Sequence, residues 1–182
     1  MILATENLEK EHLYILRLAA IMEKIATNQI FNKAHIESLV FLIRNYADGI
    51  HHAKEEKVLF LKVFELPKIT NDKTLENILK QHEQGRRYAD YIDDHLSFYL
   101  AGIEASLQEL YKTMLFYVSF IREHINFENN VLFPHVIELL KNQDHIDIQN
   151  QFSILEKSSF CGNIVAEFEK KIDQLAKEYD IS

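Results

Sequence analysis

Two short segments of the chain share one pattern of residues that can bind a metal. The first runs from His51 to Phe60 and the second from His124 to Phe133, and each reads H-x-x-x-E-x-x-V-L-F. A His and a Glu four residues apart lie on one face of an α-helix, roughly 5–6 Å apart at their Cβ atoms. Two such helices can therefore close around a pair of metal ions.

His12 and His82 add one polar residue each to two further stretches with helical periodicity. Burying two carboxylates without partners costs several kcal/mol each, and metal coordination commonly meets that cost. Six ligands are too many for one tetrahedral zinc but suit two metals bridged by the two carboxylates. Nitrogen and oxygen ligands without a thiolate favour iron, manganese or a mixed centre over copper(I) or a structural zinc. The candidate metal ligands are His12, His51, Glu55, His82, His124 and Glu128.

A second pair, His52 and Glu56, has the same spacing one residue further along, turned by about 100° around the helix. Alignment of the two V-L-F sequences favours His51 and Glu55, and leaves His52 and Glu56 open as alternatives or as residues that orient the ligands. Glu83 is expected beside the site or at the surface. Four histidines without a partner at metal spacing are expected at the surface or at helix ends: His35, His95, His135 and His145.

The elements that must carry these residues are long helices. Gly occurs 4 times and Pro twice, whereas hairpins and tight turns rely on these residues, so an all-β fold is unfavourable. Apolar periodicity predicts an all-α, up-down-up-down four-helix bundle with an additional C-terminal helix. The expected helices cover about residues 5–27 (capped by Thr5), 33–64 (capped by Asn32, ended by Pro67), 71–102 (begun by Asn71 or Asp72), 103–141 (kinked or broken at Pro134) and 163–179.

The 182 residues are interpreted as one domain, with the bundle over about 5–141 and a C-terminal helical extension over about 142–182. Two residues near the site have several interpretations. Tyr117 belongs to the core or lines the site, and Gly85 allows a close approach or merely weakens its helix. The C-terminal helix covers the bundle or forms a homodimer contact.

Composition excludes several classes of protein. The net charge of −8 argues against a nucleic-acid partner, which requires a clustered basic face. The single cysteine, Cys161, cannot form an intrachain disulfide and is interpreted as structural or incidental. The sequence shows no secretory signal and no membrane-spanning run, so a cytoplasmic protein is expected.

The motifs resemble those of the hemerythrin-like family, also called the HHE cation-binding domain. The resemblance covers roughly residues 5–140. It rests on Glu11-His12, on His51-x-x-x-Glu55-Glu56-x-x-Leu59-Phe60, on His82-Glu83-x-Gly85-Arg86, and on His124-x-x-x-Glu128-Asn129-Asn130-Val131-Leu132-Phe133-Pro134.

The resemblance implies two non-heme iron ions in a four-helix bundle. Members of this family carry or sense oxygen, store iron, handle peroxide or nitric oxide, or help repair iron–sulfur clusters. The family's repair proteins usually have an N-terminal cysteine segment, and its oxygen carriers have an H-x4-D spacing, whereas this sequence shows neither. The expected function is therefore binding or reaction of O2, NO or peroxide at a di-iron centre, with enzymatic turnover left open. The alternatives are an iron-binding, delivery or sensing module without turnover, for example in iron–sulfur cluster repair, and a metal-free structural helical bundle.

Overall fold

The computed structural model describes residues 3–66, 73–159 and 164–181, and these residues form helices and short connections without any strand. The all-α class is thus confirmed. The helices are α1 (Glu6–Thr27), α2 (Lys33–Leu42), α3 (Phe60–Phe64), α4 (Lys73–Leu100), α5 (Ala105–Phe127), α6 (Phe133–Leu139), α7 (Asn142–Ser159) and α8 (Ile164–Glu178). Three π-helical segments continue them: η1 (Ile43–His52), η2 (Glu55–Leu59) and η3 (Glu128–Leu132).

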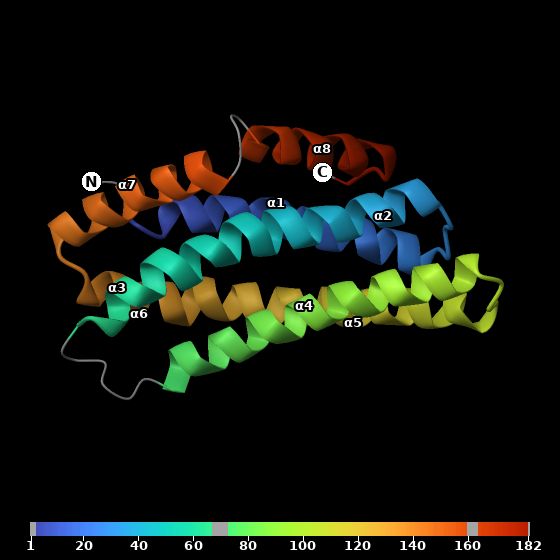
Figure 1. Ribbon diagram of the computed structural model, residues 1–182, viewed down its shortest axis with the longest axis horizontal. Coiled ribbons are helices and arrows are strands. Elements are labelled where there is room, and N and C mark those ends of the chain that lie inside the picture. Colours follow the sequence, from blue (N-terminus) through green and yellow to red (C-terminus); the bar gives the residue numbers. More distant parts are fainter. Residues whose placement is uncertain (1–2, 67–72, 160–163, 182) are drawn as a thin grey trace.

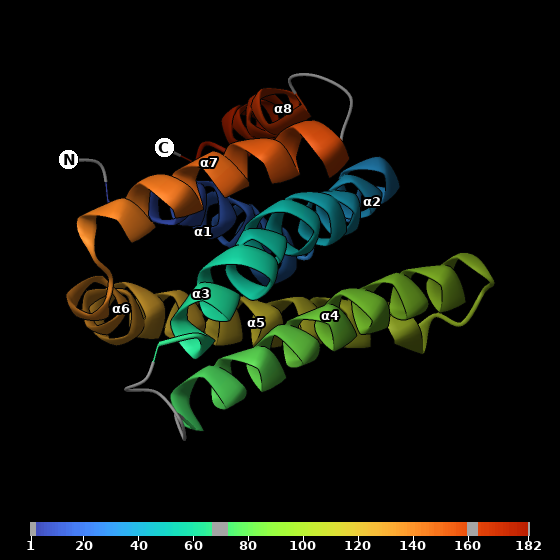
Figure 2. The ribbon, with the colours of Figure 1, turned by 60° about the vertical axis from the view of Figure 1, so that its left-hand side comes forward.

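The helices pack in two parts (Figures 1 and 2). In the larger part, α5 lies between α1 and α4, and α2 with η1 packs against α1 and α4. In the other part, α7 and α8 lie along the side of α1 and of the α2–α3 segment, on the opposite side from α4. The helices therefore enclose an interior to which several distant segments of the chain contribute.

The apolar interior consists of two clusters. Each of the four helical stretches that carry the candidate ligands contributes buried residues to both clusters. Leu8 belongs to one cluster and Ile15 to the other, with His12 between them in the chain. Ile50 and Val58 flank the first H-x-x-x-E pair in the same way. The polar residues singled out by the sequence thus form one layer between two apolar layers.

The π-helical segments begin or end at the polar layer. Segment η1 ends at His52, η2 begins at Glu55, and η3 begins at Glu128. A π-helix bonds i to i+5 and is wider than an α-helix, and such turns frequently mark functional sites. The widened turn also precedes Pro134, which lies in the first turn of α6, so the helical path is not broken there, and the kink expected at this proline stays a prediction.

Some helix ends differ from the sequence-based expectation. Asn32 caps α2 as expected, because its side chain accepts a hydrogen bond from the His35 amide at 3.2 Å. Thr5 precedes α1 but makes no capping hydrogen bond. Helix α7 was not expected as a helix of its own within the helical extension, since the apolar pattern weakens after residue 142. It packs onto the rest through few apolar residues, among them Ile148 and Phe152. Pro67, Asn71, Asp72, Cys161 and Asn163 lie outside the described residues.

Candidate metal centre

All six candidate ligands meet in the polar layer. His12 comes from α1, His51 and Glu55 from the η1–η2 stretch, His82 from α4, and His124 and Glu128 from the α5–η3 stretch. Each of these side chains is buried, and His52 joins them from the end of η1. The seven residues form two groups in which ligand atoms lie within 4.8 Å of one another. The four-residue group is His12, His51, Glu55 and Glu128, and the three-histidine group is His52, His82 and His124.

The two carboxylates belong to the four-residue group and also face the three-histidine group. Glu128 Oε2 is 3.1 Å from His12 Nε2, whereas Glu128 Oε1 is 3.2 Å from His124 Nε2. Glu55 Oε2 is 3.6 Å from His51 Nε2 and 3.4 Å from His82 Nε2. Each carboxylate therefore faces histidines of both groups, which is the position of a bridging ligand between two metals.

The outer nitrogen of every ring is already occupied. The Nδ1 atoms contact oxygen atoms at 2.7–3.2 Å, and three of the five partners are carboxylates that can only accept when ionised. The pairs are His12 with Asn129, His51 with Glu11, His52 with Asp48, His82 with Glu56, and His124 with Gln81. This arrangement places the proton on Nδ1 and turns the Nε2 lone pair toward the centre, as metal-ligating histidines require.

The inner atoms consequently lack hydrogen-bond donors. His12 Nε2 and His51 Nε2 are 2.9 Å apart, yet both act as acceptors once their Nδ1 atoms carry the protons. The Nε2 atoms of His52, His82 and His124 are buried and have no hydrogen-bond partner within the described structure. The same is true of both oxygens of Glu55 and of Glu128. Buried lone pairs that face one another are costly, and a bound cation satisfies them, so the residues present fit a metal.

The electrostatics of the site agree with this fit. Burial lowers the pKa of His52 to about 4 and that of His124 to about 3, so both rings are neutral at pH 7, the form that binds metals. Burial would also lower the pKa of His82, but the carboxylates of Glu128 and Glu56 more than offset it and raise that pKa. The carboxylates therefore attract positive charge to the centre.

Glu55 and Glu128 differ in their environments. Burial, with Glu128 alongside, raises the pKa of Glu55 well above its ordinary value. Burial acts in the same direction on Glu128, but the surrounding histidines bring its pKa well below the ordinary value. Two carboxylates this close repel each other unless positive charge lies between them.

Two ionic networks hold the outer partners in place, a partly exposed one around Arg86 and a buried one around Lys54. On one side, Arg86 donates to Asp48 at 2.8 Å and to Glu56 at 2.7 Å, and thereby connects the partners of His52 and His82. On the other side, Lys54 donates to Glu11, the partner of His51. These charged residues thus hold the hydrogen-bond partners of His51, His52 and His82 in place, and through them the three rings.

His52 is the residue that the sequence-based ligand set left out. It was left open as an alternative to His51 or as a residue that orients the ligands. In the structure its Nε2 faces the centre beside the other histidines, and its ring stacks on that of His82 at 3.8 Å between centroids. The two adjacent histidines in the sequence HHAKE could have indicated that both bind metal. The alignment of the two H-x-x-x-E motifs selected only His51, so His52 was not included in the ligand set. Glu56 does have the supporting position that was expected, and Glu83 is exposed.

The four histidines expected away from the site are spread over the molecule. His135 is exposed, and His35 and His95 are partly buried. His35 Nδ1 lies 2.7 Å from the Tyr179 hydroxyl. His145 lies in the first turn of α7, at a helix end as expected, but it is not at the surface, because it is 2% exposed and its Nδ1 accepts a hydrogen bond from the Ala4 amide. The N-terminal segment and α7 are therefore joined through this ring.

Fold and site together define an all-helical protein with a buried His/Glu group that could hold metal ions. The hemerythrin HHE cation binding domain family matches residues 3–136. The chain belongs to this family, and the resemblance seen in the motifs is confirmed. Comparison with curated proteins gave no match, and neither did comparison with solved structures. Among the described residues, no helix combines the length and apolar character needed to cross a bilayer.

Proposed function

We propose that this chain is a non-heme di-iron protein whose centre binds or reacts with O2, NO or peroxide. One observation carries the proposal: Glu55 and Glu128 lie between two sets of histidines, and the inner atoms of all these residues lack a hydrogen-bond donor. His12 and His51 would hold one iron, and His82, His124 and His52 the other. The family's cation-binding role supports the assignment to metal.

The chemistry of the donor set supports iron. Neutral imidazoles with two carboxylates and no thiolate suit iron or manganese better than a structural zinc. A bound iron pair supplies redox chemistry and a coordination position for a small ligand. The two carboxylates bring two negative charges, whereas two ferrous ions carry four positive charges. Oxidation would add further positive charge that the ligands do not neutralise, so this donor set favours the ferrous state.

The protein's own residues orient the ligands and keep water out. Glu11, Asp48 and Glu56 hold the rings of three histidines through Nδ1, so that each Nε2 is fixed before a metal arrives. The apolar layers above and below the centre exclude solvent. Such a dry site with fixed ligands strengthens every electrostatic interaction within it.

The bundle expected from the sequence is part of the proposal. Along α1 the chain passes from one apolar cluster to the other, and along η1–η2 it returns. The same alternation recurs along α4 and α5. This order supports an up-down-up-down four-helix bundle, with the C-terminal extension packed on it in a single domain over residues 1–182.

A pair of glutamate variants tests the function. Iron per chain is measured by elemental analysis after anaerobic purification of Glu55→Ala and of Glu83→Ala, an exposed glutamate next to His82 in the sequence. The first variant is expected to lose one or both irons, whereas the second keeps two. Two irons in Glu55→Ala would remove Glu55 from the centre. Reaction with O2, NO or peroxide is then followed by stopped-flow absorbance on the wild type.

A further inference from the structure

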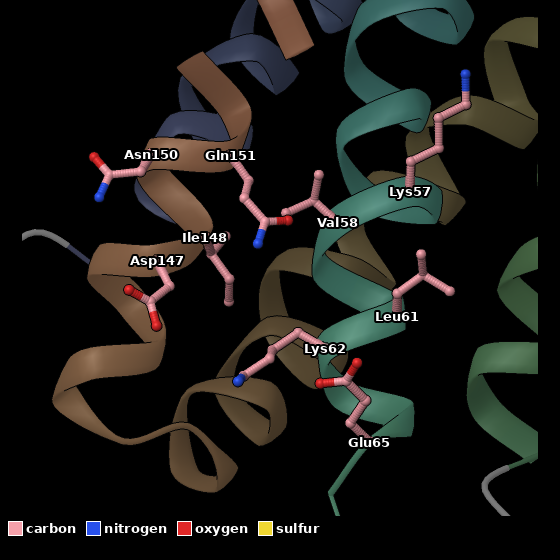
Figure 3. Close-up of a pocket in the computed structure, with 9 residues that line it drawn as sticks. All are labelled: Lys57, Val58, Leu61, Lys62, Glu65, Asp147, Ile148, Asn150 and Gln151. Carbon is pink, nitrogen blue, oxygen red and sulfur yellow. The ribbon is translucent and has the colours of Figure 1, made fainter. Parts of the chain in front are cut away.

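A pocket of about 260 Å³ leads from the surface between η1, α4 and α5 to the side chain of His52. We will refer to it as the His52 pocket, because His52 both lines it and belongs to the three-histidine group. Another pocket, between the η2–α3 stretch and α7 (Figure 3), shares no lining residue with either ligand group. Lys62 and Glu65 line that pocket, which is a polar surface groove.

The lining of the His52 pocket changes from charged to apolar with depth. Arg44 and Asp90 are well exposed, with 43% and 64% of their side-chain surface accessible, and they mark the rim. The inner wall is buried and mostly apolar, and it is formed by Ala47, Gly85, Ala89, Tyr117 and Ile121. A molecule that enters between the rim residues therefore leaves water before it meets the ring of His52.

Charge at the rim disfavours anions. Arg44 is paired with Asp90 and Asp93, both at 2.8 Å. Arg86 is paired with Asp48 and Glu56, at 2.8 and 2.7 Å. Each guanidinium is thus neutralised by two carboxylates, so the rim offers an anion no net attraction.

The inner wall accommodates a small molecule because three of its positions have little or no side chain. Ala47 and Ala89 stand on η1 and α4, and Gly85 lies one turn before Ala89. A Cβ added at Gly85 would come within 3.5 Å of the Phe120 ring, which is ordinary contact. Tyr117 adds a hydroxyl, and burial together with the Asp48 carboxylate raises its pKa, so it stays a donor at neutral pH.

We propose that the His52 pocket is the entry and binding site for a small uncharged ligand of the centre, in the size class of O2, NO or hydrogen peroxide. This inference rests on the proposed di-iron function for its biological meaning. Its geometric content, an apolar pocket that ends at His52, is independent of that function.

The test fills the pocket without touching a candidate ligand. Ala89→Leu places three more carbon atoms in the pocket, and Ala34→Leu makes the same change at an exposed position of α2. Iron content and the rate of NO association with the ferrous protein are measured for both variants and for the wild type. Ala89→Leu is expected to slow NO association about ten-fold or more while two irons remain, because the ligand must displace a packed side chain. Ala34→Leu keeps the wild-type rate.

Gly85→Ala is a milder second variant, in case Ala89→Leu does not fold. It adds one methyl at ordinary contact distance and favours the helix, and it should slow NO association about two-fold or more. Wild-type rates in every pocket variant that holds two irons would overturn the proposal. The ratio of the azide to the NO association rate is also measured for the protein and for a solvent-exposed di-iron model complex. A higher ratio in the protein than in the complex would overturn the preference for uncharged ligands, because azide is an anion.

A second readout separates this inference from the iron assignment. Crystals of the wild type and of both Leu variants are pressurised with xenon, an apolar atom that occupies cavities of this kind. Xenon density is expected beside Ala89 in the wild type and in Ala34→Leu, and is lost in Ala89→Leu. If the wild type holds no iron, the proposed function fails, but the xenon result still decides on the pocket. Absence of xenon from the wild-type pocket would contradict its apolar entry role.

Discussion

Replacement of Lys54 by Met probes the charged network behind the metal centre. Lys54 is fully buried. Its Nζ donates hydrogen bonds to Glu11 and, at 2.7 Å, to Asn7, and it also forms an ion pair with Glu156 of α7 at 2.5 Å. Met has nearly the same length and shape, so the variant removes the charge and the hydrogen bonds but leaves the packing almost unchanged.

The loss in the free energy of unfolding depends on the Glu11 carboxylate, which Lys54→Met leaves buried without its partner. Removal of one partner of a buried ion pair costs about 3–5 kcal/mol, because the other charge stays buried without compensation. Glu11 can relieve part of this cost by taking up a proton, since burial already raises its pKa to about 7 against the effect of Lys54. We therefore expect the low end, about 3 kcal/mol. For a chain of this size the melting temperature should fall by about 9 °C.

The same change should reach the metal through Glu11, which accepts from His51 Nδ1 at 3.1 Å. A protonated Glu11 no longer strengthens the His51 donor, and loss of such a partner typically costs about 10–100-fold in metal affinity. Urea and thermal unfolding of the metal-free protein measure the first effect, and competition with an iron chelator measures the second. Lys57→Met, at an exposed position in the same segment, is the control and should stay within about 0.5 kcal/mol of the wild type. Equal stability of the two variants would refute this reasoning.

Three further substitutions test separate parts of the site. Glu128→Ala should abolish binding of both irons, since its two oxygens face different histidine sets; elemental analysis would reject this if one iron remained at full occupancy. His52→Phe keeps the ring stacked on that of His82 but removes the nitrogen, so iron should fall toward one per chain, while His135→Phe at the surface changes nothing. Glu156→Gln should lower the free energy of unfolding by about 1 kcal/mol through Lys54, and an unchanged urea midpoint would show that α7 is not coupled to the centre.

The sequence predicted the site better than it predicted the path of the backbone. Periodicity and the repeated H-x-x-x-E pattern sufficed to place six polar residues in one layer, since helical spacing fixes which side chains share a face. The π-helical turns were not predicted, because the sequence spacing between His51 and Glu55 is the same whether the backbone between them is α-helical or π-helical. His52 was left out of the predicted ligand set, and kept only as an alternative, for the same reason: on a regular α-helix it would point about 100° away from His51.

The C-terminal part illustrates a second limit. Helix α7 contacts the rest of the molecule through few apolar residues and through the polar pairs of Glu156 with Lys54 and of His145 with the Ala4 amide. Such contacts leave little apolar periodicity in the sequence, so neither the helix nor the burial of His145 could be predicted from the pattern. The burial of Lys54 in the bundle could not be predicted from the pattern either. Lysines are almost never fully buried unless they are paired, and the partners of Lys54 are known only from the structure.

Titration of ferrous iron into the metal-free protein under anaerobic conditions tests the central claim most directly. Bound iron per chain is measured by elemental analysis after removal of excess metal. The account predicts saturation at two irons per wild-type chain, with iron spectroscopically coupled in pairs after oxidation. A folded protein that binds no iron, or that saturates at one iron, would contradict the di-iron centre.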